Sequence, residues 1–274
     1  MNMTHVATNF RRRPAVRGFT VTELLVVISI IAVIVAILLP AAGQLRANAR
    51  SAKDLLNLRS LVQANITYST DNAGYFASPR TNWDNPAVRN SWVKTTGIVN
   101  PENETNLAAG TLWEYLNGAA EAYKSPLDPT DRIRSYSFSS YVGVTIPDDW
   151  TQGGGPLVPL PPGQTTLDTR TLSKLPRPAE TLAAIGEFDA VLPYNLAGWI
   201  IDWSTPLWID TPATWNGVKV NHSTYDGAVR SINIMSDRFR RSIEESGYHN
   251  VTEPLDGSAW AAIRGSILPG RLPY

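Results

Sequence analysis

Glu23 is the residue whose position most clearly requires a chemical partner. It stands at the start of an uncharged apolar run, Leu24 to Gly43, and lies four residues after Phe19. A carboxylate in a membrane-spanning helix costs up to about 3 kcal/mol at depth, and such residues usually have a partner. If the chain were cut between Gly18 and Phe19, the new amino group would lie one helical turn from Glu23, in the same chain or in a neighbouring copy. The spacing therefore predicts an ion pair between Glu23 and an amine.

The apolar run after Glu23 fits a membrane-spanning helix. It is rich in Ile, Val and Leu, and its length matches the roughly 20 residues that cross a hydrocarbon core. Three interpretations compete: a secretory signal cut near LLPAAGQ, a permanent anchor, and a more specific processing signal. The first two supply no partner for Glu23. A basic cluster before the run favours a cytoplasmic N-terminus and a C-terminal bulk outside: Arg11, Arg12, Arg13 and Arg17.

The basic leader, Gly18, Phe19, Glu23 and the apolar run together resemble the prepilin signature of type IV pilins and type II secretion pseudopilins. The resemblance implies cleavage after Gly18 by a prepilin peptidase and N-methylation of Phe19. It also implies self-assembly with other pilin or pseudopilin subunits at an inner-membrane assembly platform. Pro40 lies where such proteins commonly carry a helix-kinking proline.

The segment after Pro40 has the pattern of an amphipathic helix. Apolar residues recur at spacings of three and four: Ala49, Ala52, Leu55, Leu58, Val62 and Ile66. Charged residues are expected on the other faces: Arg46, Arg50, Lys53, Asp54 and Arg59. We expect one helix that runs to about Ser69 and is stopped by the cluster Asp71, Asn72 and Gly74. Pro40 either kinks this helix or ends its spanning half.

The expected organisation is a leader (1–18), a transmembrane half-helix (19–43), an amphipathic half-helix (44–72) and a head (73–274). The head is rich in prolines and turn residues, which indicates a loop-rich α+β fold with an antiparallel sheet on the helix. Residues 151–164 read as a long surface loop rather than a linker. The pattern predicts a helix over 110–123 and strands within 135–146, 181–188, 217–222 and 229–235.

The head is also similar, in the order of its segments, to large pilin-like proteins found in planctomycetes. Those heads carry a Cys-Pro dipeptide where this chain has Ser125-Pro126, and a His followed ten residues later by Asp-Gly in a final β-hairpin. Here His222 is followed too early by Asp226-Gly227, while Asp237 comes too late. The hairpin is expected, with a departure from the motif around His222.

The head offers little sign of chemistry. It has no nucleophile elbow and no HExxH pattern, so we expect no enzymatic activity. Loop carboxylates make calcium an alternative to solvated turns, at Asp128 with Asp131 or at Asp148 with Asp149. Basic residues do not cluster enough to predict nucleic-acid binding. Four tryptophans either pack in the core or are exposed to a sugar or protein partner: Trp199, Trp203, Trp208 and Trp215.

The sequence thus predicts a structural subunit in the inner membrane, with a single pass, a cytoplasmic N-terminus and a periplasmic head that later enters a filament. The rival interpretation is an exported periplasmic binding protein or enzyme with a simple N-terminal signal or anchor. A third is a sensor or adhesin that uses the prepilin route. The sequence does not separate a pilus from a secretion pseudopilus.

Overall fold

A computed structural model gives an α+β fold with a long N-terminal helix and an antiparallel sheet in the head. The chain divides into two compact units, residues 1–48 and 49–274. Gly18 and the rest of the leader lie outside the described residues, as do Asp148 and Asp149. The structure describes residues 19–81, 90–94, 103–146, 160, 162–188, 198–203, 205–233, 236–246, 249–252 and 258–271.

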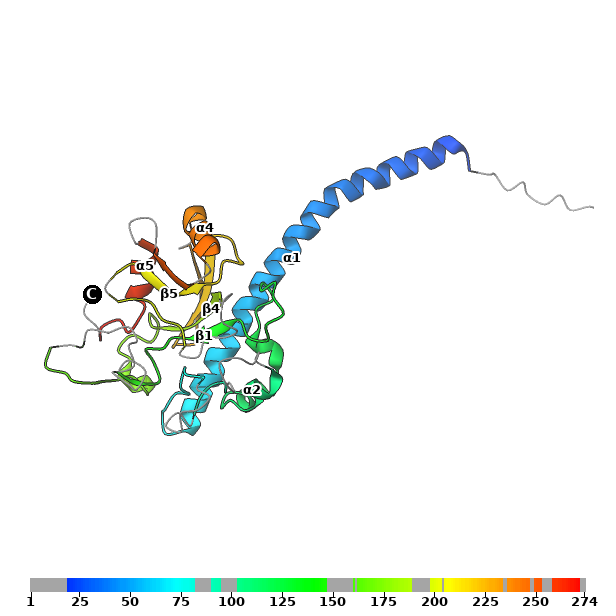
Figure 1. The fold of residues 1–274 in the computed structure, drawn as a ribbon. Helices are drawn as coiled ribbons and strands as arrows, with labels where there is room; N and C mark the ends of the chain where they lie inside the picture. Colours follow the sequence, from blue (N-terminus) through cyan, green and yellow to red (C-terminus); the bar gives the residue numbers. More distant parts are fainter. Residues whose placement is uncertain are drawn as a thin grey trace, which may run out of the picture. The chain divides into compact units, whose positions relative to one another are not determined.

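The long helix α1 (Val21–Asp71) has 51 residues and continues through Pro40, so the proline does not end it (Figure 1). It is long and apolar enough to cross a membrane by length and composition. The helix ends where the sequence predicts, within two residues. There Gly74 adopts a left-handed φ of 84°, and its N–H donates to the Ser69 carbonyl at 2.7 Å. This arrangement satisfies a carbonyl that the last turn leaves open.

The head is built on a six-stranded sheet in which neighbouring strands are antiparallel. The order is β7-β6-β4-β5-β8, and β1 also pairs with β4. A smaller ladder joins β2 (Thr145–Ile146) to β3 (Leu167–Asp168). The strands of the main sheet are β1 (Tyr136–Phe138), β4 (Leu182–Phe188), β5 (Leu207–Pro212), β6 (Lys219–Thr224), β7 (Val229–Asn233) and β8 (His249–Thr252).

The four segments predicted as strands all contain strands, but the helix predicted over 110–123 is wrong. That segment forms two 3-10 turns, η1 (Glu114–Leu116) and η2 (Ala120–Tyr123). They are separated because Asn117 and Gly118 adopt left-handed φ values of 54° and 69°, which an α-helix cannot contain. Elements that the pattern missed are β3, β5, β8, α2 (Glu104–Ala108), η3 (Leu172–Lys174), α4 (Asp237–Ser246) and α5 (Ser258–Gly265).

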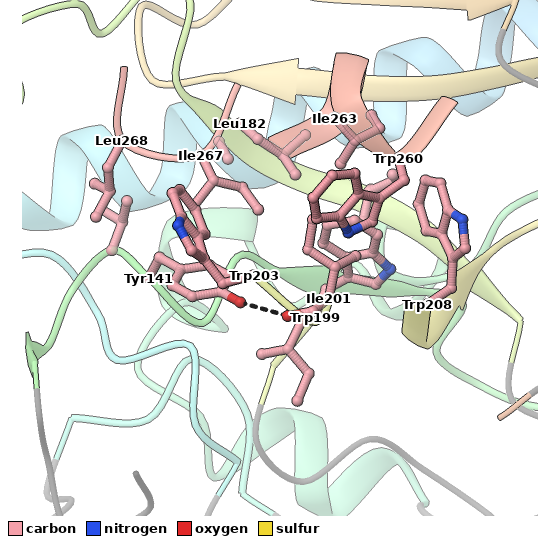
Figure 2. Packing of buried hydrophobic residues seen from close by; sticks show 14 of the residues in the cluster. Tyr141, Leu182, Trp199, Ile201, Trp203, Trp208, Trp260, Ile263, Ile267 and Leu268 are labelled. Carbon is pink, nitrogen blue, oxygen red and sulfur yellow. Dashed lines mark hydrogen bonds between the residues drawn. The ribbon is translucent and has the colours of Figure 1, made fainter. Parts of the chain in front are cut away.

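Aromatic side chains fill the core of the head (Figure 2). Trp199, Trp203 and Trp208 are buried, which confirms the core interpretation for these three. The Tyr141 hydroxyl donates to the Ile201 carbonyl at 2.9 Å and so satisfies its polar atom inside the cluster. Trp215 differs: it is half-buried, and the Arg132 guanidinium lies 5.5 Å from its ring centroid.

Candidate functional site

Glu23 has a partner, Thr20, at the N-terminal cap of its own helix. Its Oε2 accepts hydrogen bonds from the Thr20 backbone N–H at 2.9 Å and the Thr20 hydroxyl at 2.8 Å. The Thr20 hydroxyl in turn accepts from the Glu23 N–H at 3.2 Å. This reciprocal pattern is a capping box, which satisfies free donors in the first helical turn. The T-x-x-E spacing was the sequence signal for it, and the expectation that Glu23 lacks a partner in the uncut chain was therefore wrong.

Phe19 precedes α1 and is 76% exposed. The backbone that would carry the new amine thus lies outside the helix, one residue before its cap. Gly18 lies outside the described residues, so cleavage after it and methylation of Phe19 stay predictions. The ion pair between Glu23 and an amine stays a prediction as well.

The first half of α1 exposes an apolar surface along its length. Within Val21–Asn48, the part of α1 in the first unit, no residue is buried. Side chains such as Val33 and Ile37 remain about as exposed as surface residues, although transfer of each out of water is favourable by about 1.5 to 3 kcal/mol. A contiguous apolar surface of this kind marks a site of contact with lipid or with another protein, which fits a membrane anchor. Pro40 lies within it, and its role in assembly stays a prediction.

The second half of α1 carries buried polar groups instead. Asp54 is only 5% exposed, and its carboxylate accepts hydrogen bonds from the Ser125 hydroxyl at 2.5 Å, the Tyr136 hydroxyl at 2.6 Å and the Asn221 amide at 2.7 Å. These donors come from the turn after η2, from β1 and from β6. One helix carboxylate therefore joins three separate segments of the head, and we call it the Asp54 hub.

The Asp54 hub corrects the predicted helix face. The sequence placed Asp54 on a solvated face and Ala49 and Ala52 on the packed one, whereas Asp54 is buried and both alanines are exposed. Leu58 and Val62 are buried as expected. The polarity pattern failed because head donors compensate the buried carboxylate, and these donors lie far away in the sequence.

Two asparagines on the same helix face also bind the head. The Asn57 amide donates to the carbonyls of Glu121 at 2.9 Å and Lys124 at 2.7 Å. The Asn65 side-chain oxygen accepts from the Ala77 N–H at 2.9 Å. Both asparagines are buried. The head therefore recognises α1 through positioned hydrogen bonds as well as through apolar packing.

Ser125 takes the place of the cysteine in the expected likeness to planctomycete pilin-like heads, which stays a prediction. Its hydroxyl donates to Asp54 and accepts from the Leu127 N–H at 3.1 Å. A serine hydroxyl can donate and accept at once, and its donor is stronger than that of a thiol. In this chain the position therefore serves the Asp54 hub.

Asp128, a calcium candidate, is already engaged by other groups. Its carboxylate accepts from Ser135 at 2.6 Å and from the Thr130 hydroxyl at 2.7 Å, and it forms an ion pair with Arg132 at 3.0 Å. Asp131 is exposed. Within the part of the chain that the structure describes, no group of three or more His, Asp or Glu residues could hold a metal ion. Calcium binding stays a prediction without a described ligand set.

The expected hairpin around His222 is formed by β6 and β7. Its turn is closed by Asp226, which accepts from the Thr224 hydroxyl at 2.6 Å and the Ala228 N–H at 3.0 Å. Gly227 has a φ of 84° and faces Gln63 of α1. His222 is buried, and burial together with the nearby Arg230 charge lowers its pKa to about 4. It is therefore neutral near pH 7 and serves packing rather than proton transfer at that pH. Asp237, the other acid after His222, begins α4.

A comparison with protein-family models matched residues 13–39 to the family described as "Prokaryotic N-terminal methylation motif". The match covers the end of the leader, Glu23 and most of the apolar run, and it does not extend into the head. Neither the curated proteins nor the solved structures gave a match. The matched segment contains the residues that carry the resemblance stated above. The chain thus bears a prepilin-type N-terminal signature, which is similar to that of type IV pilins and pseudopilins.

Proposed function

We propose that this chain is a structural subunit of a filament, either a type IV pilus or a type II secretion pseudopilus. A prepilin peptidase cuts it after Gly18 and methylates Phe19. The subunit then leaves the inner membrane, and its apolar half-helix packs against those of other subunits, so that helix contacts replace lipid contacts. The supporting observation is the methylation motif at the start of a helix whose first half exposes only unpacked side chains.

The first experiment is the N-terminal sequence and intact mass of the membrane-extracted protein, expressed with and without a prepilin peptidase. The proposal expects a peptidase-dependent start at Phe19 with the mass of one added methyl group. A start near Ala42 that does not depend on the peptidase would contradict it. That result would support the rival interpretation, an exported binding protein or enzyme whose helix is only a signal.

A second experiment separates the charge of Glu23 from its role in the capping box. Glu23→Gln keeps a residue that can complete the box but removes the charge. We expect this variant to insert and to be cut, but to be lost from filaments sheared from cells. Thr20→Ser is the matched control, because it keeps the cap and the carboxylate. Filaments with normal amounts of Glu23→Gln would contradict a charge-based role.

A further inference from the structure

A polar groove of about 330 Å³ runs along α1 on the head, beside the segment that holds η1 and η2. This segment lies within the green part of the chain in Figure 1. On the α1 side the groove is lined by a stripe that includes Lys53, Ser60 and Thr67, whose spacing places them on one helix face. Tyr115 and Asn117 lie on the opposite wall. The volume is within the range of small-ligand sites.

The two walls of the groove are held in place before any ligand arrives. Asn57 donates from α1 to the carbonyls of Glu121 and Lys124, which fixes η2 against the helix. Tyr115 packs edge-on against Tyr68 of α1, with ring centroids 5.6 Å apart. A preformed site loses little conformational entropy on binding, which favours small ligands.

The hydroxyls of the helix wall are arranged as acceptors. Ser60 Oγ donates to the Leu56 carbonyl and Thr67 Oγ1 to the Gln63 carbonyl, both at 2.9 Å. Their protons are used within the helix, so their free lone pairs are directed to other donors. Lys53 on the helix wall and Asn117 on the opposite wall are exposed and supply N–H donors. The groove therefore offers both acceptors and donors to one ligand.

The charge and polarity of the lining restrict the class of ligand. Lys53 and Glu121 are its ionisable residues apart from Tyr115, and their charges cancel. A polyanion such as a nucleic acid would require a basic lining. An amphipathic helix would require large apolar anchor pockets, whereas the aliphatic lining residues here are three alanines and Leu116, and the rest carry hydroxyl, amide or charged groups. A neutral molecule with many hydroxyl groups, each able to donate and accept, fits the arrangement, and the Tyr115 ring adds an apolar surface for its carbon skeleton.

We propose that this groove binds a neutral saccharide. The inference goes beyond filament assembly and does not depend on it, because every lining residue belongs to the head unit, residues 49–274. The uncut chain would bind as well as the processed one. Failure of processing would therefore not affect the result.

The test uses the full chain in detergent and three neutral oligosaccharides as probes: cellotetraose, maltotetraose and chitotetraose. Binding is measured by NMR of the protein and by calorimetry at ligand concentrations up to about 10 mM. We expect at least one probe to bind and to shift the signals of groove residues such as Asn117. Thr67→Glu, which adds bulk and a charge in the groove, should weaken that binding at least tenfold.

Thr70→Glu is the matched control. Thr70 is also exposed on α1 and its hydroxyl donates to the carbonyl four residues earlier, at 3.1 Å, but it lies outside the groove. We expect this variant to bind like the original chain. Three results would overturn the proposal: no binding by any probe, equal effects of both substitutions, or groove signals that shift with protein concentration alone. The last result would assign the groove to a second copy of the chain.

Discussion

The two halves of α1 form one continuous helix but differ in burial and in the polarity of their contacts. The first half exposes apolar side chains and buries none, whereas the second half buries Asp54, Asn57 and Asn65 against the head. Apolar surface is non-directional, so the first half accepts lipid or any helix of suitable shape. Buried polar groups require particular donors and acceptors in particular places. The first half of α1 can therefore replace one apolar environment by another, whereas the second half is specific for its own head.

Asp54→Ala should have the largest effect, because it removes the main polar contact between the second half of α1 and the head. It leaves the donors of Ser125, Tyr136 and Asn221 buried without their acceptor, and we expect the free energy of unfolding of the head to fall by about 4 kcal/mol. The measurement is urea unfolding of the detergent-solubilised chain, followed by tryptophan fluorescence. Membrane insertion should stay normal. Lys53→Ala, an exposed neighbour, is the control and should change the value by less than about 0.5 kcal/mol. An unchanged midpoint for Asp54→Ala would contradict the hub.

Acid should weaken the head through His222. The unfolded chain binds a proton at this residue below pH 6.5, whereas the folded head resists protonation until the lowered pKa of about 4. Stability is therefore highest above pH 6.5 and falls as the pH drops toward 4, by about 3 kcal/mol in total. Unfolding measured across this range should show the slope, and His222→Gln should flatten it. The lowered pKa values of Asp168 and Asp226 act at lower pH, below 3.8. An unchanged slope in His222→Gln would rule out this assignment.

Substitution of one glycine in the head and one in the first half of α1 should also have different effects, but smaller ones. A Cβ at Gly110 in the head would lie 2.1 Å from the Trp92 carbonyl oxygen and 2.6 Å from Val93 Cα, so backbone must move. We expect Gly110→Ala to lower the melting temperature by an amount that corresponds to about 2 kcal/mol. Gly43→Ala, in the first half of α1, meets nothing within 4 Å and should strengthen the helix by up to about 1 kcal/mol. Equal effects of the two substitutions would contradict the packing difference.

Features set by local pattern could be predicted from the sequence. The apolar run, the end of α1 at Asp71 before the turn at Gly74 and the strands β4, β6 and β7 all follow from periodicity and turn residues. The burial of Trp199, Trp203 and Trp208 also agrees with their size and apolar character. The capping box of Thr20 and Glu23 is likewise a local feature, because its T-x-x-E spacing is visible in the sequence.

Features set by distant partners could not be predicted. From the local sequence, Asp54 is expected to be exposed to solvent. Its hydrogen bonds with Ser125 and Asn221 are not indicated by any local spacing. The strand β8 is likewise defined by pairing with β5 rather than by its own composition. Left-handed Asn117 converted an apolar helical pattern into 3-10 turns. Such context overrides propensity.

The Asp54 hub also implies that some contacts of the head form later than others during folding. Its three donors lie 71, 82 and 167 residues further along the chain. Contacts between residues so far apart in the sequence close late, because the chain must first lose the entropy of the intervening loops. While the chain is being made, the Asp54 carboxylate therefore stays hydrated until β6 has emerged. In the proposed route, the apolar half of α1 therefore enters the membrane before its polar half has a head to bind.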